Sequence, residues 1–291
     1  MRRKTTAVRI GNVVLSSEEP VLVQSMLNTS TREVDACVEQ AIRIIEAGGR
    51  LVRITAPGVK EAEMLGEIHR RLRERGYTTP ISADIHFVAE AASVAARYVE
   101  KVRINPGNFA DKRATFKKLT YTDEEYAAEL EILRQKFTEF LEVCRQYGTA
   151  VRIGTNHGSL SDRIMSRYGD TPAGMVEATM EYLRVCQACD FKDVVISLKS
   201  SDCRTMVDAV RLLVEKMEAE GMCYPLHLGV TEAGEGEDGR IRSAVGIGTL
   251  LNEGIGDTIR VSLTEEPEAE IPVACELARI CSEPEYLKGW T

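Results

Sequence analysis

Four short segments of the chain share one pattern, in which an arginine stands between two β-branched residues and a small or polar residue follows. The segments are Val52-Arg53-Ile54-Thr55, Val102-Arg103-Ile104-Asn105, Val151-Arg152-Ile153-Gly154 and Ile259-Arg260-Val261-Ser262. In a β-strand, neighbouring side chains point to opposite faces, so the aliphatic pair would pack one way and the arginine the other. Four guanidinium groups placed in this way predict a cationic site that an anion fills.

A lysine and several small polar residues extend this candidate site. Lys199 follows another predicted strand and is the fifth cation at a strand end. A guanidinium fork matches phosphate oxygens, and several desolvated cations are costly to hold together unless an anion is present. Since one phosphate does not need five cationic partners, the set indicates a diphosphate. Uncharged candidates at the strand ends are Gln24, Ser25, Asn105, Asn156, Ser200 and Ser262.

Each arginine taken alone also has a structural interpretation. A strand arginine is most often salt-bridged or has its charged end at the surface, and Asp84 or Glu232 could neutralise part of the charge. Four copies of one pattern together with Lys199 favour a binding role instead.

Acidic and imidazole groups near the same strand ends are candidates for proton transfer. Asp84 and His86 alternate on one face of a predicted strand, and Glu232 lies in a loop of small residues where a carboxylate has little structural reason to be. His227 stands in a later strand and joins the set that could contact a ligand. A lone histidine can equally be a hydrogen-bonded structural residue.

Gly246 and Gly248 lie between the last two predicted strands, in the segment Ser243–Thr249. A short helix start at this place in a barrel commonly binds phosphate through free backbone N–H groups. Close helix packing explains a Gly-x-Gly pattern equally well, so both interpretations stay open.

The eight cysteines do not form a convincing metal-binding pattern. Cys186 and Cys189 have C-x-x-C spacing, but they come late in a predicted helix, at the end of the barrel opposite the predicted site. A second pair at metal-ligand spacing and a nearby histidine cluster are both missing from the sequence. We therefore predict no metal site and interpret the cysteines as reduced thiols that pack as small apolar residues.

Alternating strand and helix patterns must position these residues. Strands are predicted at residues 21–25, 51–55, 81–85, 101–105, 150–154, 193–198, 226–230 and 258–262. Helices are predicted at residues 32–47, 60–75, 88–98, 123–146, 171–188, 203–220, 243–251 and 268–280. Eight such units predict an α/β fold, a (β/α)8 TIM barrel, whose active site lies at the carboxyl ends of its strands. An N-terminal β-hairpin around Gly11-Asn12 would cap the barrel floor, and residues 106–148 would lengthen the connection between the fourth and fifth strands.

Composition narrows the class of protein further. The chain has 291 residues, of which 44% are hydrophobic, and its formal net charge is −8. This negative charge argues against a general nucleic-acid-binding surface. It has no run of about 18 apolar residues, so we expect no membrane span. The basic start at Met1–Lys4 is not followed by an apolar segment typical of a secretory signal. We therefore expect a cytoplasmic protein.

With these residues in view, the chain resembles the N-terminal barrel of the 4-hydroxy-3-methylbut-2-enyl diphosphate synthase family of the non-mevalonate isoprenoid pathway. The resemblance runs from about Thr6 to Ala278. The motifs that carry it are Val23–Met26, Ala83–Phe87, Val102–Asn108, Arg152–Leu160, Ser197–Ser200, Leu226–Gly234 and Gly246–Leu251. The long segment Phe109–Tyr147 is similar to the branch of the family found in plants, chlamydiae and Bacteroides-like bacteria.

The resemblance implies a reaction and a set of site residues. The family reductively opens 2-C-methyl-D-erythritol 2,4-cyclodiphosphate with two electrons from a [4Fe–4S] cluster, and ferredoxin or flavodoxin is the electron donor. Glu232 matches a glutamate implicated in the reduction, and Asp84 and His86 match residues close to the substrate. The positions that match the family's substrate-binding residues are Gln24, Arg53, Arg103, Asn105, Arg152, Asn156, Lys199, Arg260 and Ser262.

The chain also departs from the family pattern. The family holds its cluster with three cysteines and a glutamate on a C-terminal domain, whereas this sequence stops after the eighth predicted helix, at Gly289–Thr291. We therefore expect residues 1–291 to be one substrate-binding barrel domain without the inserted domain or the cluster domain. Such an isolated barrel is expected to hold no cluster, to bind substrate weakly and to turn over nothing.

Two alternatives stay open. A pterin-binding barrel of the dihydropteroate synthase type has a similar fold, but it needs a pocket for a flat heterocycle. Aromatic residues make up 5% of the sequence, and Phe87 is the one aromatic residue near the predicted strand ends. The other alternative is a phosphate-binding barrel with no chemistry of its own.

Overall fold

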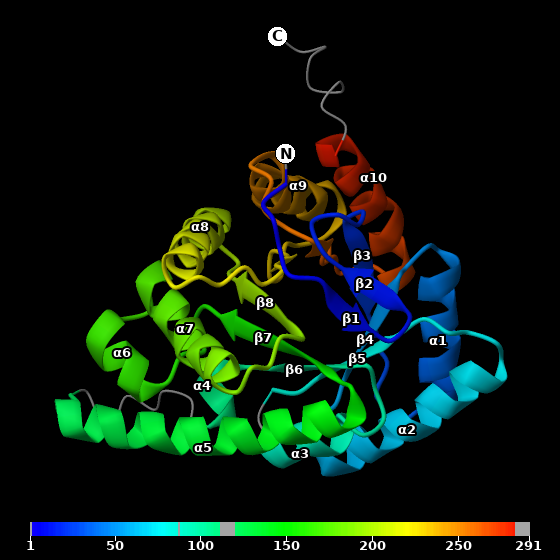
Figure 1. Ribbon diagram of the computed structural model, residues 1–291. Helices are drawn as coiled ribbons and strands as arrows, with labels where there is room; N and C mark the ends of the chain where they lie inside the picture. The colour runs from blue at the N-terminus through cyan, green and yellow to red at the C-terminus, as the bar shows by residue number, and fades with distance from the viewer. Residues whose placement is uncertain (1, 87, 111–119, 283–291) are drawn as a thin grey trace, which may run out of the picture.

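Eight parallel strands form a barrel that is surrounded by helices (Figure 1). The computed structural model describes residues 2–86, 88–110 and 120–282; Met1, Phe87, residues 111–119 of the long connection and residues 283–291 lie outside the described residues. The barrel strands are β3 (Leu22–Met26), β4 (Leu51–Thr55), β5 (Ile81–Asp84), β6 (Lys101–Ile104), β7 (Ala150–Asn156), β8 (Val194–Lys199), β9 (His227–Leu228) and β10 (Thr258–Ile259). The predicted (β/α)8 TIM barrel is confirmed.

The strands follow one another around the barrel in chain order. β3 pairs with both β4 and β10, and β10 pairs with β9. A parallel bridge between Ile196 of β8 and Leu226, just before β9, joins the remaining two edges. All strands therefore end at one mouth of the barrel, where their last residues converge.

The opposite end of the barrel is closed by apolar residues. The antiparallel hairpin of β1 (Val8–Ile10) and β2 (Val13–Leu15) presents Val8, Ile10, Val13 and Leu15 to the first inward-facing residues of the barrel strands. Those barrel residues are Leu22, Leu51, Ala150 and Val195, all of them buried. The predicted cap on the barrel floor is thus confirmed, and burial of this apolar surface stabilises it.

Helices cover the outside of the barrel. They are α1 (Val34–Glu46), α2 (Val59–Glu74), α3 (Ala89–Ala95), α4 (Pro106–Phe109), α5 (Asp123–Tyr147), α6 (Asp162–Tyr168), α7 (Pro172–Ala188), α8 (Cys203–Ala219), α9 (Gly236–Asn252) and α10 (Glu270–Ser282), with the 3-10 turn η1 (Pro267–Ala269) before the last. None of the described helices is both long enough and apolar enough to cross a membrane.

The long helix α5 lies across the outside of the barrel against α3 and α7 (Figure 1). It begins with a capping box, in which Thr122 accepts a hydrogen bond from the Glu125 backbone and Glu125 accepts one from the Thr122 backbone. Its buried face carries Phe137 and Phe140, which pack on Phe109 of α4. The lengthened connection between β6 and β7 is thereby tied to the barrel wall.

The predicted and observed elements agree closely except near the end of the chain. The helix expected to start at Ser243 begins at Gly236, and this part of the prediction is wrong. Two short helices at the mouth, α4 and α6, were not predicted because each is shorter than the periodic pattern that identifies a helix.

Candidate anion-binding site

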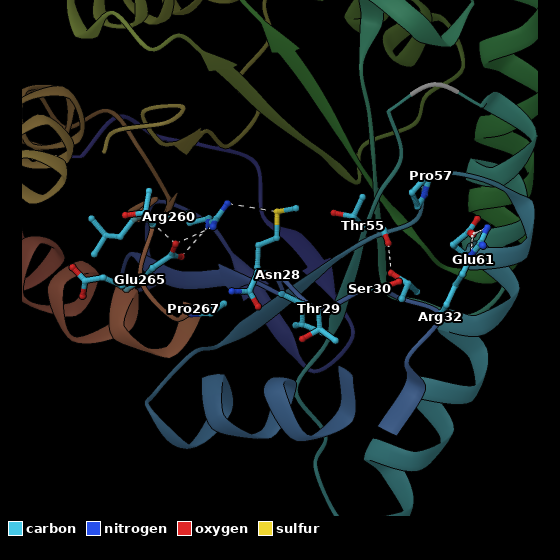
Figure 2. Close-up of a pocket in the computed structure, with 16 residues that line it drawn as sticks. Asn28, Thr29, Ser30, Arg32, Thr55, Pro57, Glu61, Arg260, Glu265 and Pro267 are labelled. Carbon is cyan, nitrogen blue, oxygen red and sulfur yellow. Dashed lines mark hydrogen bonds and ion pairs between the residues drawn. The ribbon is translucent and has the colours of Figure 1, made fainter. Parts of the chain in front are cut away.

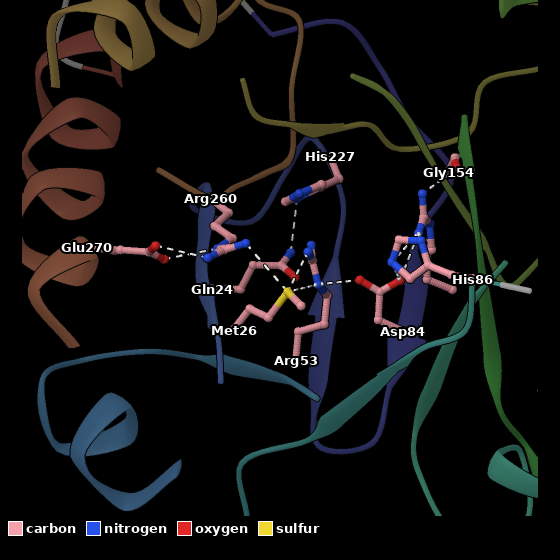
Figure 3. Close-up of polar contacts among 10 residues, drawn as sticks. Gln24, Met26, Arg53, Asp84, His86, Gly154, His227, Arg260 and Glu270 are labelled. Atoms are coloured by element: carbon pink, nitrogen blue, oxygen red, sulfur yellow. Dashed lines mark hydrogen bonds and ion pairs between the residues drawn. The ribbon is translucent and has the colours of Figure 1, made fainter. Parts of the chain in front are cut away.

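One buried carboxylate holds two of the predicted arginines at the mouth. Asp84, at the end of β5, is 1% exposed; its Oδ2 lies 2.9 Å from Nε of Arg53, and its Oδ1 accepts a hydrogen bond from Nη1 of Arg103 at 2.9 Å (Figure 3). Burial alone would raise the pKa of Asp84, but the two guanidinium groups hold it well below its usual value. Asp84 is therefore ionised at neutral pH and orients the side chains on its two neighbouring strands.

Arg103 depends on a glycine on the next strand. Its Nη2 donates to the carbonyl oxygen of Gly154 at 2.8 Å. A Cβ atom at Gly154 would lie 2.5 Å from Nε of Arg103, so a larger residue would displace the guanidinium group. The glycine that ends the third Arg-containing segment is thus explained by close approach. His86 lies beside the same pair, with Nε2 3.4 Å from Oδ1 of Asp84.

A second carboxylate holds the arginine on the other side of the mouth. Glu270, the first residue of α10, accepts from Nε and Nη2 of Arg260 at 2.9 Å each. The sulfur of Met26 stands between the two groups of arginines, 2.7 Å from Nη2 of Arg53 and 3.5 Å from Nη1 of Arg260 (Figure 3).

Other cations in the barrel have no such partner. Arg152 is 2% exposed, and its Nε and Nη1 have no hydrogen-bond partner within the described chain. Lys101, buried on β6, likewise has an unpartnered Nζ among the described residues. Burial and the neighbouring guanidinium groups lower the pKa values of Arg152, Lys101 and the half-buried Lys199 well below their usual values.

The balance of charge in this layer is therefore strongly positive. Asp84 and Glu270 are the acidic side chains paired with its arginines. The cationic side chains are Arg53, Lys101, Arg103, Arg152, Lys199 and Arg260. Burial lowers the pKa of Arg53 to about 10 despite the adjacent Asp84, and repulsion by Arg260 and Arg103 adds to this effect. An anion would relieve this repulsion.

A neutral polar layer lies deeper in the barrel. His227 is fully buried, its Nδ1 lies 3.1 Å from Nε2 of Gln24, and that amide also donates to Thr258 at 2.7 Å. Burial, with Lys199 and Arg152 nearby, lowers the pKa of His227 well below its usual value. His227 is therefore uncharged at neutral pH. Gln24 and His227 contact each other inside the barrel, and their role in ligand binding stays a prediction.

A cavity of about 850 Å³ opens beside the arginines (Figure 2). Arg260 and Glu270 form part of its inner wall, and the loop after β3, with Asn28, Thr29 and Ser30, forms its outer wall. Gln40 of α1 fixes that loop by accepting hydrogen bonds from the backbone N–H groups of Asn28 and Thr29. The cavity thus adjoins the cationic layer at Arg260, and both polar and apolar side chains line it.

Several predicted polar residues serve the structure of the mouth. Ser25 points away from the barrel interior and donates to Glu270 Oε2 at 2.6 Å. Asn105 caps α4 by accepting from the Gly107 backbone, and its amide donates to Ser159 at 2.9 Å. Ser200 accepts from the Asp202 backbone at 3.1 Å. Ser25 thus contacts a supporting carboxylate instead of lining the barrel with Gln24, because neighbouring residues of a strand face opposite sides.

Asn156 and Ser262 remain available at the mouth. Both are half-buried, Asn156 as the last residue of β7 and Ser262 three residues after β10. Glu232 is exposed in the loop between β9 and α9, and its φ of 51° places it in the left-handed region that residues other than glycine rarely adopt. The structure therefore presents this carboxylate to solvent at the mouth in a strained backbone conformation.

Gly246 and Gly248 lie inside α9, not at its start. Their backbone N–H groups fall in the helix interior, where such groups bond to the preceding turn. A Cβ atom at Gly246 would lie 2.7 Å from Cγ2 of Val230 and 2.9 Å from Cε of Met206. Of the two interpretations of this motif, helix packing fits the geometry, and the expected phosphate-binding helix start at Ser243 is wrong.

Sequence reasoning missed Lys101 and Glu270. Lys101 precedes Arg103 by two positions, so strand alternation alone places both on the inner face. Glu270 carried no such signal, because it reaches Arg260 from the first turn of a helix, ten positions further along the chain.

The cysteines lie outside this site. All eight are free, and burial raises the pKa of Cys186 on α7 well above its usual value. Within the described part of the chain, no group of three or more Cys, His, Asp or Glu side chains is arranged to hold a metal ion.

The family model and the curated relatives that match this chain point to the same protein family. The family described as the GcpE TIM-barrel domain matches residues 5–275. The 4-hydroxy-3-methylbut-2-en-1-yl diphosphate synthase (flavodoxin) of Parabacteroides distasonis is 63% identical over 98% of this chain and 46% of the relative. The chloroplastic ferredoxin-type synthase of Arabidopsis thaliana is 52% identical over 96% of this chain and 38% of the relative. The chain thus spans less than half the length of these curated relatives.

Solved structures share the fold at much lower sequence identity. The dihydropteroate synthase of Yersinia pestis superposes with a TM-score of 0.61 at 12% identity, covering 95% of this chain and 99% of that one. An N-acetylneuraminic acid synthetase of Leptospira borgpetersenii gives a TM-score of 0.60 at 9% identity, covering 98% and 93%. At this identity the likeness concerns the barrel alone.

Proposed function

The chain belongs to the GcpE TIM-barrel family, and on this premise we propose that it is the substrate-binding barrel of a 4-hydroxy-3-methylbut-2-enyl diphosphate synthase. Its ligand is 2-C-methyl-D-erythritol 2,4-cyclodiphosphate. The observation that carries the proposal is the buried layer of cations, in which Arg152 has donors without partners among the described residues. Two linked phosphate groups supply the negative charge that this layer lacks.

The cations have two kinds of role in this proposal. Arg53, Arg103 and Arg260 are held in place by carboxylates, so their remaining N–H groups are directed before the ligand arrives. Arg152 has no carboxylate partner among the described residues, and Lys199 lies close to like charges; both contribute charge that the ligand neutralises. Asn156 and Ser262 bind the remaining oxygens or hydroxyl groups at the mouth.

The candidates for proton transfer divide in the same way. Asp84 is ionised and fixed between Arg53 and Arg103. We therefore propose that it orients these two arginines and does not transfer a proton. Glu232 is exposed at the mouth and moves a proton during cleavage of the C–O bond, and His86, half-buried beside Asp84, lies close to the same ligand.

The described residues do not fit an iron–sulfur cluster. The family's [4Fe–4S] cluster needs several thiolates together, and the free cysteines of this chain form no such group among the described residues. We therefore assign this chain substrate binding alone, and the reducing electrons reach the ligand from outside it. The relatives' names give flavodoxin or ferredoxin as the donor, and we propose the same class of donor here.

Two further expectations stay proposals. We propose that residues 1–291 form one substrate-binding domain of a protein with further domains, since the curated relatives are more than twice as long as this chain. The cytoplasmic location expected from the sequence also stays a prediction.

Isothermal titration of the chain with the cyclic diphosphate, with inorganic diphosphate as the comparison ligand, tests the proposal. We expect saturable binding that prefers the cyclic compound. Equal affinity for both ligands would favour a phosphate-binding barrel without this substrate, and no binding of either would contradict the proposal. Glu232→Gln in a synthase that carries its cluster domain is expected to lower kcat more than affinity, and unimpaired turnover would remove its role.

A further inference from the structure

Glu270 makes four hydrogen bonds in the barrel wall. Its two carboxylate oxygens accept from Nε and Nη2 of Arg260 at 2.9 Å, from the hydroxyl of Ser25 at 2.6 Å and from the backbone N–H of Leu263 at 3.1 Å. The residue is 1% exposed. Two of these bonds come from Arg260, one from Leu263 three positions further on and one from Ser25 of β3, so the carboxylate is held by two separate parts of the chain.

The paired geometry determines how Arg260 faces the cavity. Nε and one N–H of Nη2 are occupied by Glu270, and this two-point contact fixes the plane of the guanidinium group. Nη1 is left toward Met26, with the sulfur 3.5 Å away, and both Arg260 and Glu270 line the cavity (Figures 2 and 3). Without Glu270, the long arginine side chain would have to be ordered by the ligand itself.

The same arrangement occurs on the other side of the mouth. Asp84 holds Arg53 and Arg103 as Glu270 holds Arg260, and both carboxylates are 1% exposed. Glu270 differs in its origin, because it stands on α10 outside the ring of strands. Through Ser25 and Leu263 it also ties β3 and the segment after β10 to that helix.

We infer that Glu270 is a positioning residue, which fixes Arg260 for a phosphate group of the ligand without contacting the ligand. This inference rests on the proposed function, because the proposed function makes Arg260 one of the arginines that bind the phosphate groups of the ligand. It also gives Ser25 a supporting role, one contact further from the ligand than the sequence predicted.

The test is binding of inorganic diphosphate and of the cyclic diphosphate by the 291-residue chain. Glu270→Gln keeps the size of the side chain, but it removes the charge and turns an N–H₂ group toward a donor. We expect at least tenfold weaker binding of both ligands. Ser25→Ala removes one contact of Glu270 and none of Arg260, so we expect a loss of about two- to threefold.

A double-mutant cycle separates positioning from a general structural role. In the Arg260→Leu background, Glu270→Gln should weaken binding by less than twofold, because the residue through which it acts is gone. Glu268→Gln is the matched control, since Glu268 lies two positions away and pairs with Arg43 on the surface. The control should bind as the parent chain does.

Three results would overturn the inference. They are unchanged binding by Glu270→Gln, an equal loss in the Arg260→Leu background, or an equal loss in Glu268→Gln. If Glu270→Gln does not fold, unchanged binding by Ser25→Ala overturns it instead. Failure of the parent chain to bind either ligand contradicts the proposed function as well, whereas normal parent binding with an insensitive Glu270→Gln contradicts this inference alone.

Discussion

Two arginines in this protein are equally buried, yet they lie in opposite electrostatic surroundings. Arg163 on α6 is 1% exposed and Arg152 on β7 is 2% exposed. Nη1 of Arg163 lies 2.6 Å from Glu181, and its guanidinium carbon lies 4.6 Å from the ring centre of Tyr126. Arg152 has like charges as neighbours, and its Nε and Nη1 lack partners among the described residues.

This contrast separates a charge that is paired within the fold from one that we propose binds an anion. Tyr126 of α5 also donates to Glu181, so the ion pair around Arg163 joins α5, α6 and α7. Buried charges are tolerated when they are paired in this way. Arg152 has no such ion pair among the described residues, and a protein retains such a cost where an external anion offsets it. Burial of an arginine alone would not have distinguished the two.

Stability should separate the two arginines most strongly. Arg163→Leu leaves Glu181 buried without its ion-pair partner, and we expect the free energy of unfolding to fall by about 3–5 kcal/mol. Arg152→Leu removes an unpaired buried charge, so the free energy of unfolding should stay unchanged or rise. Urea unfolding followed by circular dichroism measures both. A similar loss of stability in the two variants would contradict the distinction.

Ligand affinity should show the reverse order. Arg152→Leu removes charge-assisted hydrogen bonds to a phosphate group, and we expect binding of the cyclic diphosphate to weaken by about 1.5–3 kcal/mol, roughly 10- to 150-fold. Arg163→Leu, measured at a temperature where it is folded, should bind within about twofold of the parent. Titration calorimetry on both variants gives the comparison, and an unchanged dissociation constant for Arg152→Leu would remove it from the clamp.

The sequence predicted the direction of the arginine side chains better than it predicted the carboxylates that hold them. Strand alternation alone placed Arg53, Arg103, Arg152 and Arg260 on the inner face, because a repeated local pattern determines which way a side chain points. The same alternation would also have predicted that Ser25 and its neighbour Gln24 point to opposite faces of the strand, as they do. The two errors of placement, at Ser25 and Gly246, both concern residues whose neighbours come from elsewhere in the chain.

Other features could not be predicted from local patterns. Glu270 meets Arg260 because α10 packs against β3, and the Arg163–Glu181 ion pair exists because α6 packs against α7. The start of α9 at Gly236 runs against helix propensity, because Gly236 and Gly239 are both poor helix formers. Packing in the folded barrel overrides that propensity, so tertiary contacts decide these positions.

The pH dependence of binding tests the unpaired charges directly. Burial lowers the pKa of Lys199, and the surrounding Arg53, Arg152, Arg260 and Arg103 lower it further by repelling its proton. A bound anion raises that pKa, so binding takes up protons between the free-state and bound-state values. Affinity should fall as pH rises through that window, by up to about tenfold per pH unit for one proton.

Calorimetry in buffers of different ionisation enthalpy measures the number of protons taken up. The cyclic diphosphate is the suitable ligand, because its phosphate groups are esterified and do not titrate near neutral pH. Lys199→Met should reduce the uptake, whereas Lys216→Met, on the outer helix α8, should leave it unchanged. Binding without any proton uptake would show that the cations of the barrel are fully charged before the ligand arrives.

The smallest expected effect concerns the two non-glycine residues in the described chain with positive φ. Glu232 has a φ of 51° at the mouth, and Asp190 has a φ of 47° in the turn after α7. A left-handed conformation costs a glutamate about 1–2 kcal/mol, and glycine avoids it but loses about 0.5–1 kcal/mol of that gain to chain entropy. We therefore expect Glu232→Gly to raise the free energy of unfolding by about 0.5–1 kcal/mol.

Asp190→Gly provides the matched control for this strain. Aspartate tolerates the left-handed region better than glutamate does, so its gain in unfolding free energy should be smaller, and ligand binding should not change. Both gains can be measured by urea unfolding of the 291-residue chain. If Glu232→Gly were instead destabilising, the carboxylate would contribute to the stability of the fold. Glu232 would then resemble the structural Arg163 and not the unpaired Arg152. A gain in stability would mean that the mouth keeps a strained glutamate, as it keeps an unpaired arginine, at the expense of the free protein.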